Sequence, residues 1–550
     1  MNSCIYYHPE AYTTNGPKLM GRNAAGESFL RAFFSYSKAE EFWVQVEEAK
    51  HAELFLQQAR SLGRSESVNQ VDRSNLGSLS KPGLLYYPGP DIGAKAFHRA
   101  AFGHGEWSLC GVTHTTSSAA SMDSITGLLT EPVQPWDAVI CTSTAVKDNV
   151  NRLLQAQADY LKDRLGASKI VLPQLPVIPL GIHTKDFAFS NAQKSQARAD
   201  LGVEKDTLVV TYMGRLSFHA KAHPLAMYQA LEKAAQATCK SVVLVECGWH
   251  SNEFIEKAFQ DAAQLACPSV KVITLDGRLA ESRQQAWAGA DIFCSLADNI
   301  QETFGIVLIE AMAAGLPVVV SDWDGYKDTV RHEVDGFRIP TLMPPNSFGG
   351  GLALRHALGI DSYDMYCGHT CSLISVDVEA TAAAFTKLFN SSELRAQMGK
   401  AGLQRAQEIY DWKHIIPQYE DLWAELAKIR ALESVKLESL AHPWPARLDP
   451  FHAFEVYPTL TLTHQSKLEL VDPDKEKSLG KIRACRKLAM VNFAEFVLPS
   501  DEEVLSLVEL AAEGANSAEA FALTQPQQRQ AFVFRSLVWL VKLGVFRVLP

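Results

Sequence analysis

Short runs of β-branched residues alternate with longer amphipathic segments over most of this 550-residue chain, and that alternation constrains its fold most strongly. Strands that alternate with helices form parallel sheets joined by crossover connections, so the pattern predicts an α/β fold. Segments with helical spacing include Pro224–Ala237, Asn252–Cys267 and Glu302–Ala314. The predicted strands are Cys4–Tyr7, Gly83–Tyr87, Ala138–Thr142, Lys169–Leu172, Leu208–Tyr212, Ser241–Glu246, Lys271–Thr274, Ile292–Ser295 and Pro317–Ser321.

Nine strands are too many for a single hydrophobic core, so the pattern predicts two Rossmann-like domains that face a cleft. In such folds, ligands bind at the carboxyl ends of the strands. A polar stretch after Phe187 marks the predicted boundary, and a Pro- and aromatic-rich stretch begins near Ser439. The expected organisation is a first domain at 1–188, a second domain with closing helices at 189–431, a linker at 432–480 and a small mainly α module at 481–550.

Composition narrows the function classes. Asp and Glu number 62 against 52 Lys and Arg, so the net charge of -10 argues against broad nucleic-acid binding. The ten cysteines have no framework spacing and indicate reduced thiols of a cytoplasmic protein. No basic leader followed by an apolar run opens the chain, and no long uncharged apolar run predicts a transmembrane segment. Peripheral contact with a membrane surface stays open.

The strongest chemical signal is a pair of glutamates in QETFGIVLIEAMAAGLPVVVSDWDG. Glu302 is expected just before a helix and Glu310 two turns into it. A carboxylate suits sugar or ribose hydroxyls, because it accepts two charge-assisted hydrogen bonds. From spacing alone, two solvated glutamates on a surface helix remain the alternative.

Several motifs in a fixed order carry a family resemblance. ETFGIVLIEAMAAGLPVVVSDWDG, MGRLSFHAKAHP, PVIPLGIHTKDF and WDAVICTSTAV together resemble the retaining glycosyltransferases of family 4, which have the GT-B fold. The resemblance runs from about Ser3 to Ala431. It implies that the first domain takes the acceptor and the second domain takes a nucleotide sugar.

The resemblance also implies roles for individual residues. Glu310 would hold the ribose hydroxyls of the nucleotide, and Glu302 would contact hydroxyls of the donor sugar. Arg215 and Lys221 would neutralise the diphosphate. His114, in CGVTHTTSSAA, would face the donor sugar from the first domain.

Backbone groups complete the expected donor site. Phe304, Gly305 and Ile306 would present amides near a helix start, where the helix dipole favours an anion. Gly26 and Gly214 would lie in glycine-containing loops that approach the donor. A plain helix N-terminus is the alternative for the Gly26 segment.

The sequence departs from the family pattern at the cationic pair. Arg215 and Lys221 are six residues apart instead of five, with His219 and Ala220 inserted, so a solvated basic pair is the alternative there. Asp322 and Asp324 form a D-x-D triplet, which is interpreted as part of a loop after the predicted strand and not as a metal site. Cys367, His369 and Cys371 offer three soft ligands where a structural zinc takes four, so no metal site is predicted.

These features predict a retaining, metal-independent hexosyltransferase with no cofactor other than its nucleotide diphosphate sugar substrate. The acceptor is undetermined. Two alternatives remain: a nucleotide-sugar hydrolase or epimerase, and an inactive binding protein that acts through its C-terminal module. That module resembles a winged helix, and eight Lys or Arg against seven Asp or Glu from Lys481 to Pro550 give no charge footprint for DNA. Modules of this kind bind peptides or pack in oligomers, a plain packing module is the alternative, and the sequence assigns residues 432–550 no role.

Overall fold

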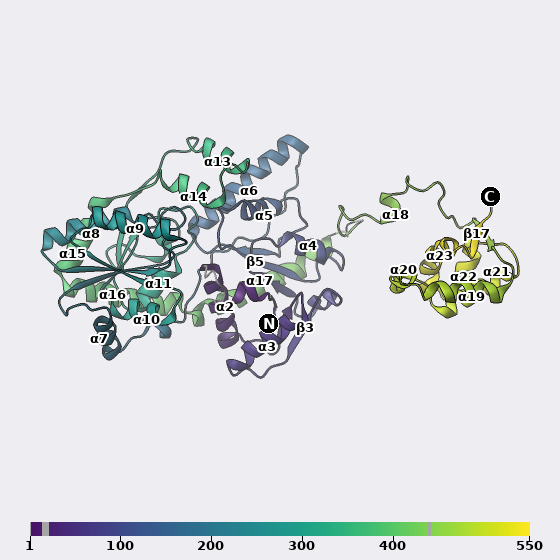
Figure 1. The fold of residues 1–550 in the computed structure, drawn as a ribbon, viewed down its shortest axis with the longest axis horizontal. Coiled ribbons are helices and arrows are strands. Elements are labelled where there is room, and N and C mark those ends of the chain that lie inside the picture. The colour runs from purple at the N-terminus through teal and green to yellow at the C-terminus, as the bar shows by residue number, and fades with distance from the viewer. Residues whose placement is uncertain (1, 14–20, 438–439, 441) are drawn as a thin grey trace. The chain divides into compact units, whose positions relative to one another are not determined.

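The computed structural model describes residues 2–13, 21–437, 440 and 442–550, and the chain forms two compact units, Met1–Trp444 and Pro445–Pro550. The first unit holds two parallel six-stranded sheets, each flanked by helices (Figure 1). This arrangement confirms the predicted α/β fold with two Rossmann-like domains.

The first sheet has the strand order β3-β2-β1-β4-β5-β6, and every pairing in it is parallel. The chain starts in the middle of the sheet, builds one edge and then returns to build the other, which is the doubly wound order. Its strands are β1 (Cys4–Tyr6), β2 (Phe42–Gln45), β3 (Val68–Val71), β4 (Leu84–Tyr86), β5 (Ser108–Val112) and β6 (Ala138–Ile140).

The second sheet repeats this order as β12-β11-β10-β7-β8-β9. Its strands also pair in parallel throughout. The order reverses direction between β7 and β10, so the connections that leave these two strands diverge and leave a crevice at their carboxyl ends. The strands are β7 (Leu208–Met213), β8 (Val242–Gly248), β9 (Lys271–Asp276), β10 (Ile292–Ser295), β11 (Val318–Ser321) and β12 (Gly336–Ile339).

Helices cover both faces of each sheet. Along β7, Leu208, Val210 and Tyr212 belong to one buried cluster, while Val209 and Met213 belong to another on the opposite face. This alternation is that of a strand buried on both sides, which explains why its sequence is continuously apolar. The flanking helices are α2 (Gly21–Tyr36), α3 (Ala49–Ser61), α4 (Gly93–Ala100), α5 (Ala119–Gly127), α6 (Thr144–Leu165), α7 (Asn191–Asp200), α8 (Leu225–Thr238), α9 (Glu253–Ala266), α10 (Ala280–Gly289), α11 (Ile306–Ala313), α15 (Val378–Asn390) and α16 (Ser392–Arg405).

The chain passes between the two domains twice, and the two passages lie side by side. The Ile182 amide donates to the Tyr410 carbonyl at 2.8 Å, and the Trp412 amide donates to the Ile182 carbonyl at 3.1 Å. After the second passage, α17 (Trp412–Glu433) buries Trp412, Tyr419 and Trp423 in the core of the first domain. The last helix of the predicted second domain at 189–431 therefore packs in the first domain. Its sequence shows an apolar stripe, but such a stripe does not reveal which sheet the helix covers.

Other predicted boundaries also change. The structure adds strands β2, β3, β5 and β12. The sequences of β3, β5 and β12 contain polar residues or glycine, and β2 has only three apolar residues before Gln45. Lys169–Leu172 forms no strand, and its side chains are only partly buried or exposed, so the apolar run there has no sheet to join. Within 302–314, the helix begins only at Ile306.

The second unit packs helices against a three-stranded antiparallel sheet of order β16-β15-β17. Its core includes Leu468 on β15 (Lys467–Leu470) and Leu479 on α19 (Lys475–Arg486). The module therefore begins before residue 481, and the predicted linker at 432–480 is shorter than expected. The remaining elements are α20 (Ala489–Asn492), α21 (Asp501–Ala512), β16 (Asn516–Ser517), α22 (Ala518–Leu523), α23 (Gln527–Lys542) and β17 (Phe546–Val548).

All ten cysteines are free thiols. Among the described residues, no helix is both long and apolar enough to span a membrane.

Candidate active site

The predicted donor-site residues gather at the crevice between β7 and β10. The loop that leaves β7 carries Arg215 and Lys221, and the loop that leaves β10 carries Glu302. Because these are the central strands where the sheet order reverses, both loops emerge at the same edge. The structure thus brings together a cationic and an acidic segment that lie about eighty residues apart in the sequence.

Glu302 forms an ion pair with Lys221. The Lys221 Nζ lies 2.5 Å from the Glu302 Oε2, and the Glu302 side chain is only 8% exposed. Burial raises the pKa of Glu302, but the Lys221 charge, its hydrogen bond and the amides of Thr303 and Phe304 outweigh burial, so the pKa falls below its ordinary value. Glu302 is therefore a carboxylate at neutral pH.

The loop between Arg215 and Lys221 is braced by hydrogen bonds to the carbonyls of His219 and Ala220. The Arg215 guanidinium donates to the carbonyl of Ala220 at 2.7 Å, so the loop folds back on its own arginine. The Asn299 amide donates to the carbonyl of His219 at 3.0 Å and fastens the same loop to the loop after β10. The six-residue spacing thus produces a braced loop with Arg215 and Lys221 on it.

Glu310 has a different environment. It lies in the second turn of α11, and no described residue hydrogen-bonds or pairs with its carboxylate. Burial raises its pKa to about 8, and the charge of Arg283 only partly offsets this effect. A desolvated carboxyl group without a partner is suited to accept hydrogen bonds from a ligand.

The start of α11 is a tight turn. Gly305, the N-cap, has a φ of +79°, and a Cβ there would overlap the ring of Tyr326. Only glycine fits this position, both for its left-handed conformation and for its close approach. The amides of Gly305 and Ile306 have no acceptor among the described residues, whereas the buried Phe304 contributes its amide to Glu302.

The first domain closes one side of this site. The Thr303 hydroxyl donates to the carbonyl of His114 at 3.1 Å, and the Ser143 hydroxyl donates to the carbonyl of Thr303 at 2.8 Å. His114 follows β5 and is partly buried. Its segment therefore lies beside Thr303, the residue after Glu302.

The two glycines expected in donor loops have different positions. Gly214 directly follows β7 and has a φ of +147°, and a Cβ there would lie 3.7 Å from the Lys221 Cε. Gly26 lies inside α2, where a Cβ would overlap the carbonyl of Ala11. Gly26 thus permits α2 to pack against α1 (Pro9–Tyr12), a role that the sequence interpretation did not anticipate. The preceding residues 14–20 lie outside the described part of the chain.

The aspartates of the D-x-D triplet have separate environments. Asp322 pairs with Arg338 at 3.3 Å. Asp324 has a φ of +46°, and burial followed by the charge of Glu302 raises its pKa to about 8. Within the described ranges, no group of three or more His, Cys, Asp or Glu side chains is arranged to hold a metal ion.

Two polar residues in the crevice were not predicted. Gln301 accepts a hydrogen bond from Arg215 at 3.3 Å, and Tyr363 lies within hydrogen-bond distance of Gln301. Gln301 directly precedes Glu302 in the sequence, so its position could have indicated a place in the site. Tyr363 comes from a distant helix, and no sequence motif marks it.

Comparisons with known proteins agree with this geometry. Residues 193–346 match the family model of group 1 glycosyl transferases. That segment contains the two loops and α11, with Arg215, Lys221, Glu302 and Glu310.

The chain is similar to curated glycosyltransferases over part of their length. A D-inositol 3-phosphate glycosyltransferase of Mycobacteroides abscessus is 27% identical over 197 residues, covering 36% of this chain and 42% of that protein. A phosphatidyl-myo-inositol mannosyltransferase of Mycobacterium tuberculosis is 26% identical over 250 residues, covering 45% and 57%. The chain thus spans about half the length of these curated relatives.

Structural similarity extends further along the chain. Anabaena HepE, crystallised in complex with UDP, aligns with a TM-score of 0.50 over 77% of this chain and 99% of its own, at 15% identity. This likeness shows a shared two-domain fold. Its coverage of 77% of the chain exceeds the segment 193–346 that the family model matches.

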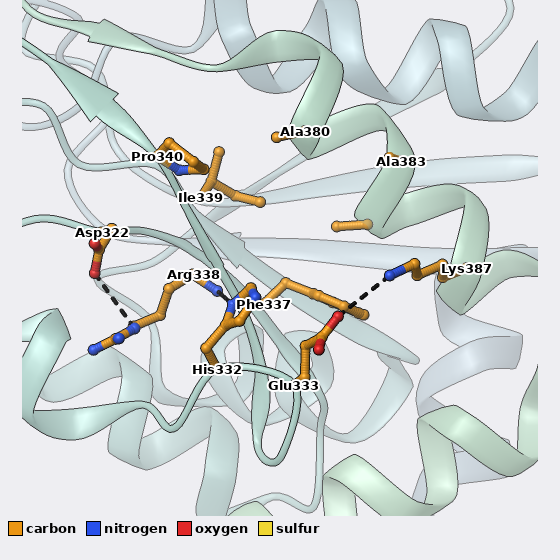
Figure 2. Close-up of a pocket in the computed structure, with 11 residues that line it drawn as sticks. Asp322, His332, Glu333, Phe337, Arg338, Ile339, Pro340, Ala380, Ala383 and Lys387 are labelled. Carbon is orange, nitrogen blue, oxygen red and sulfur yellow. Dashed lines mark hydrogen bonds and ion pairs between the residues drawn. The ribbon is translucent and has the colours of Figure 1, made fainter.

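A separate pocket of about 470 Å³ lies between β12 and α15 (Figure 2). Its charged groups are paired with one another: Arg338 with Asp322, and Lys387 with Glu333, each at 3.3 Å. None of the predicted site residues lines it. His332 also lies in its wall.

Proposed function

We propose that this protein is a retaining, metal-independent glycosyltransferase that moves a hexosyl unit from a nucleotide diphosphate sugar to an acceptor. The observation that carries the proposal is the Lys221–Glu302 ion pair beside Arg215 at the crevice, in the segment that matches group 1 glycosyl transferases. Crystallisation of Anabaena HepE with UDP supports a nucleotide donor for this fold.

The donor fits the arrangement of charges. Its diphosphate would lie against Arg215 and Lys221 and the unsatisfied amides at the start of α11. Glu310 would accept hydrogen bonds from the ribose hydroxyls, since its carboxylate has no described partner. Glu302, a carboxylate held by Lys221, would accept hydrogen bonds from the sugar.

The reaction then needs no metal and no protein base. The acceptor oxygen attacks the anomeric carbon on the face that the diphosphate leaves, and the bond between that carbon and the phosphate oxygen breaks. The acceptor proton passes to the leaving phosphate oxygen. Arg215 and Lys221 stabilise the charge that develops on the diphosphate, the task that a divalent cation performs in other enzymes.

Names of two relatives suggest the first acceptors to test. Both proteins act on inositol-containing compounds by name. We therefore include myo-inositol, its 3-phosphate and phosphatidylinositol among the acceptors. His114 would face the acceptor and the donor sugar from the first domain.

A donor screen tests the proposal. Full-length protein is titrated with UDP-glucose, GDP-mannose and ADP-glucose, and the melting temperature and nucleotide release are followed with and without acceptor. We expect one donor to stabilise the wild type and the Glu281→Ala control, an exposed α10 glutamate, but not Glu310→Ala. Stabilisation by none of the donors would contradict the proposal, and release of free sugar without acceptor would indicate a hydrolase.

A further inference from the structure

An excursion from the second domain carries a helix into the crevice. Residues 343–374 leave the domain between β13 (Thr341–Leu342) and β14 (Ser375–Val376), which pair antiparallel and form a stem. Beyond the stem lie α13 (Gly350–Ala357) and α14 (Tyr363–Cys371). Asp361, just before α14, pairs with Arg355 at 2.8 Å and with His369 at 3.0 Å, so the turn between the two helices is braced.

Helix α14 packs against the loop that holds the two cations. A Cβ at Gly368 would lie 2.9 Å from the Cβ of His219, so the helix and the loop are in close contact there. The thiol of Cys371 lies 3.9 Å from the carbonyl of His219. His219, which lies between Arg215 and Lys221, is therefore in contact with α14.

The first residue of α14 reaches both domains. The Tyr363 hydroxyl accepts a hydrogen bond from the Gln301 side-chain amide at 3.1 Å. It also lies 2.9 Å from the Ser117 hydroxyl and 3.3 Å from that of Thr115, both in the first domain after His114. The Gln301 side-chain Oε1 accepts a hydrogen bond from Arg215 at 3.3 Å, so the network ends at the guanidinium proposed to bind the diphosphate.

We propose that Tyr363 is a positioning residue that couples closure of the two domains to the placement of Arg215. Closure brings Thr115 and Ser117 to the Tyr363 hydroxyl, which orients Gln301 and through it the guanidinium. We call the contact of the Tyr363 hydroxyl with Thr115, Ser117 and Gln301 the latch. The effect of the latch on catalysis rests on the proposed function, but the contact between the two domains does not. The hydroxyl carries this role, because it is the atom of Tyr363 that contacts Gln301, Ser117 and Thr115.

Tyr363→Phe removes the hydroxyl and keeps the ring. Tyr366→Phe is the matched control, since it lies one turn further along α14 and its hydroxyl has no hydrogen bond among the described residues. Hydrogen exchange of full-length protein is measured over residues 114–118 and 301–305. We expect several-fold faster exchange of both segments in Tyr363→Phe and wild-type exchange in Tyr366→Phe. Equal exchange in both variants and the wild type would overturn the latch.

Kinetics then test the coupling with the donor that the screen identifies. We expect kcat/KM of Tyr363→Phe to fall about tenfold, as the loss of one or two hydrogen bonds predicts. Ser117→Ala should add little to Tyr363→Phe but act additively with Tyr366→Phe. An unchanged kcat/KM, or additivity in the first pair, would overturn the coupling. A wild type without any transfer would instead contradict the proposed function, and hydrogen exchange would still decide on the latch.

Discussion

The two glutamates of one loop-and-helix segment have opposite environments. Glu302 lies four residues before α11, is paired with Lys221 at 2.5 Å and has a pKa below its ordinary value. Glu310 lies within α11, lacks a partner among the described residues and has a pKa of about 8. Burial raises the pKa of both, so the difference lies in the cation that each one meets.

This difference teaches how one segment can serve two parts of a ligand. Glu302 is already a carboxylate. A ligand that binds Lys221 therefore changes the hydrogen-bond partner of Glu302 but not its charge. Glu310 is largely protonated at neutral pH, so a ligand that hydrogen-bonds to its carboxylate also releases a proton. Binding at the two ends of the segment should therefore respond differently to mutation and to pH.

The largest effect is expected when the ion pair is broken. Lys221→Met leaves the buried Glu302 carboxylate without its cation and removes a charge from the diphosphate site. We expect turnover to fall at least about 1000-fold and the free energy of unfolding to fall by about 3 kcal/mol, measured by urea unfolding. Adding Glu302→Gln should restore stability without restoring turnover.

A surface pair provides the control. Lys387 and Glu333 lie 3.3 Å apart, and each side chain is 57% exposed. Lys387→Met should change the free energy of unfolding by less than about 1 kcal/mol and leave turnover unchanged. An equal loss of stability in Lys221→Met and Lys387→Met would contradict the contrast between buried and exposed pairs.

The sequence predicted one part of this contrast and missed the other. Its motifs located Glu302, Glu310, Arg215 and Lys221, and their order along two strands placed them at one edge of a sheet. It did not predict that Lys221 pairs with Glu302 while Glu310 stays alone, because those partners are set by loop packing. For the same reason it missed Tyr363, whose place depends on a helix excursion with no motif, and it placed α17 among the closing helices of the second domain, whereas α17 packs in the core of the first.

The second largest effect concerns donor affinity. Glu310→Gln keeps the side-chain shape but removes the charged acceptor of ribose hydroxyls. We expect the Kd for the donor to rise about 10- to 100-fold, with kcat at saturation nearly unchanged, because uniform binding is lost. Calorimetric titration with the donor measures this Kd, and Glu281→Ala should bind as the wild type does. A kcat loss equal to that of Lys221→Met would contradict separate roles for the two ends.

The pH dependence of binding should be smaller but diagnostic. Donor affinity of the wild type is expected to rise by up to about tenfold per pH unit below pH 8 and to level off above it, since only the ionised Glu310 accepts both hydrogen bonds. Titration of proton release in two buffers of different ionisation enthalpy measures the coupling directly. Glu310→Gln should flatten the profile, and a wild-type profile that already levels off below pH 6 would contradict a raised pKa at Glu310.

The smallest effect is on stability, and its sign differs between the glutamates. The folded-state pKa of Glu310, about 8, lies above that of an unfolded chain, so its contribution to stability is lost as pH rises from about 4.5 to 8. Glu310→Gln should therefore leave Tm nearly unchanged near pH 4.5 and raise it progressively as the pH approaches 8. Glu302 has the opposite shift, and its stabilisation is present at neutral pH and lost as pH falls through its lowered pKa. Glu302→Gln should accordingly lower Tm at pH 7, by an amount that decreases toward pH 4. Thermal scans of both variants measure these changes. A Tm change of the same sign in both variants would mean that the two carboxylates share one electrostatic environment.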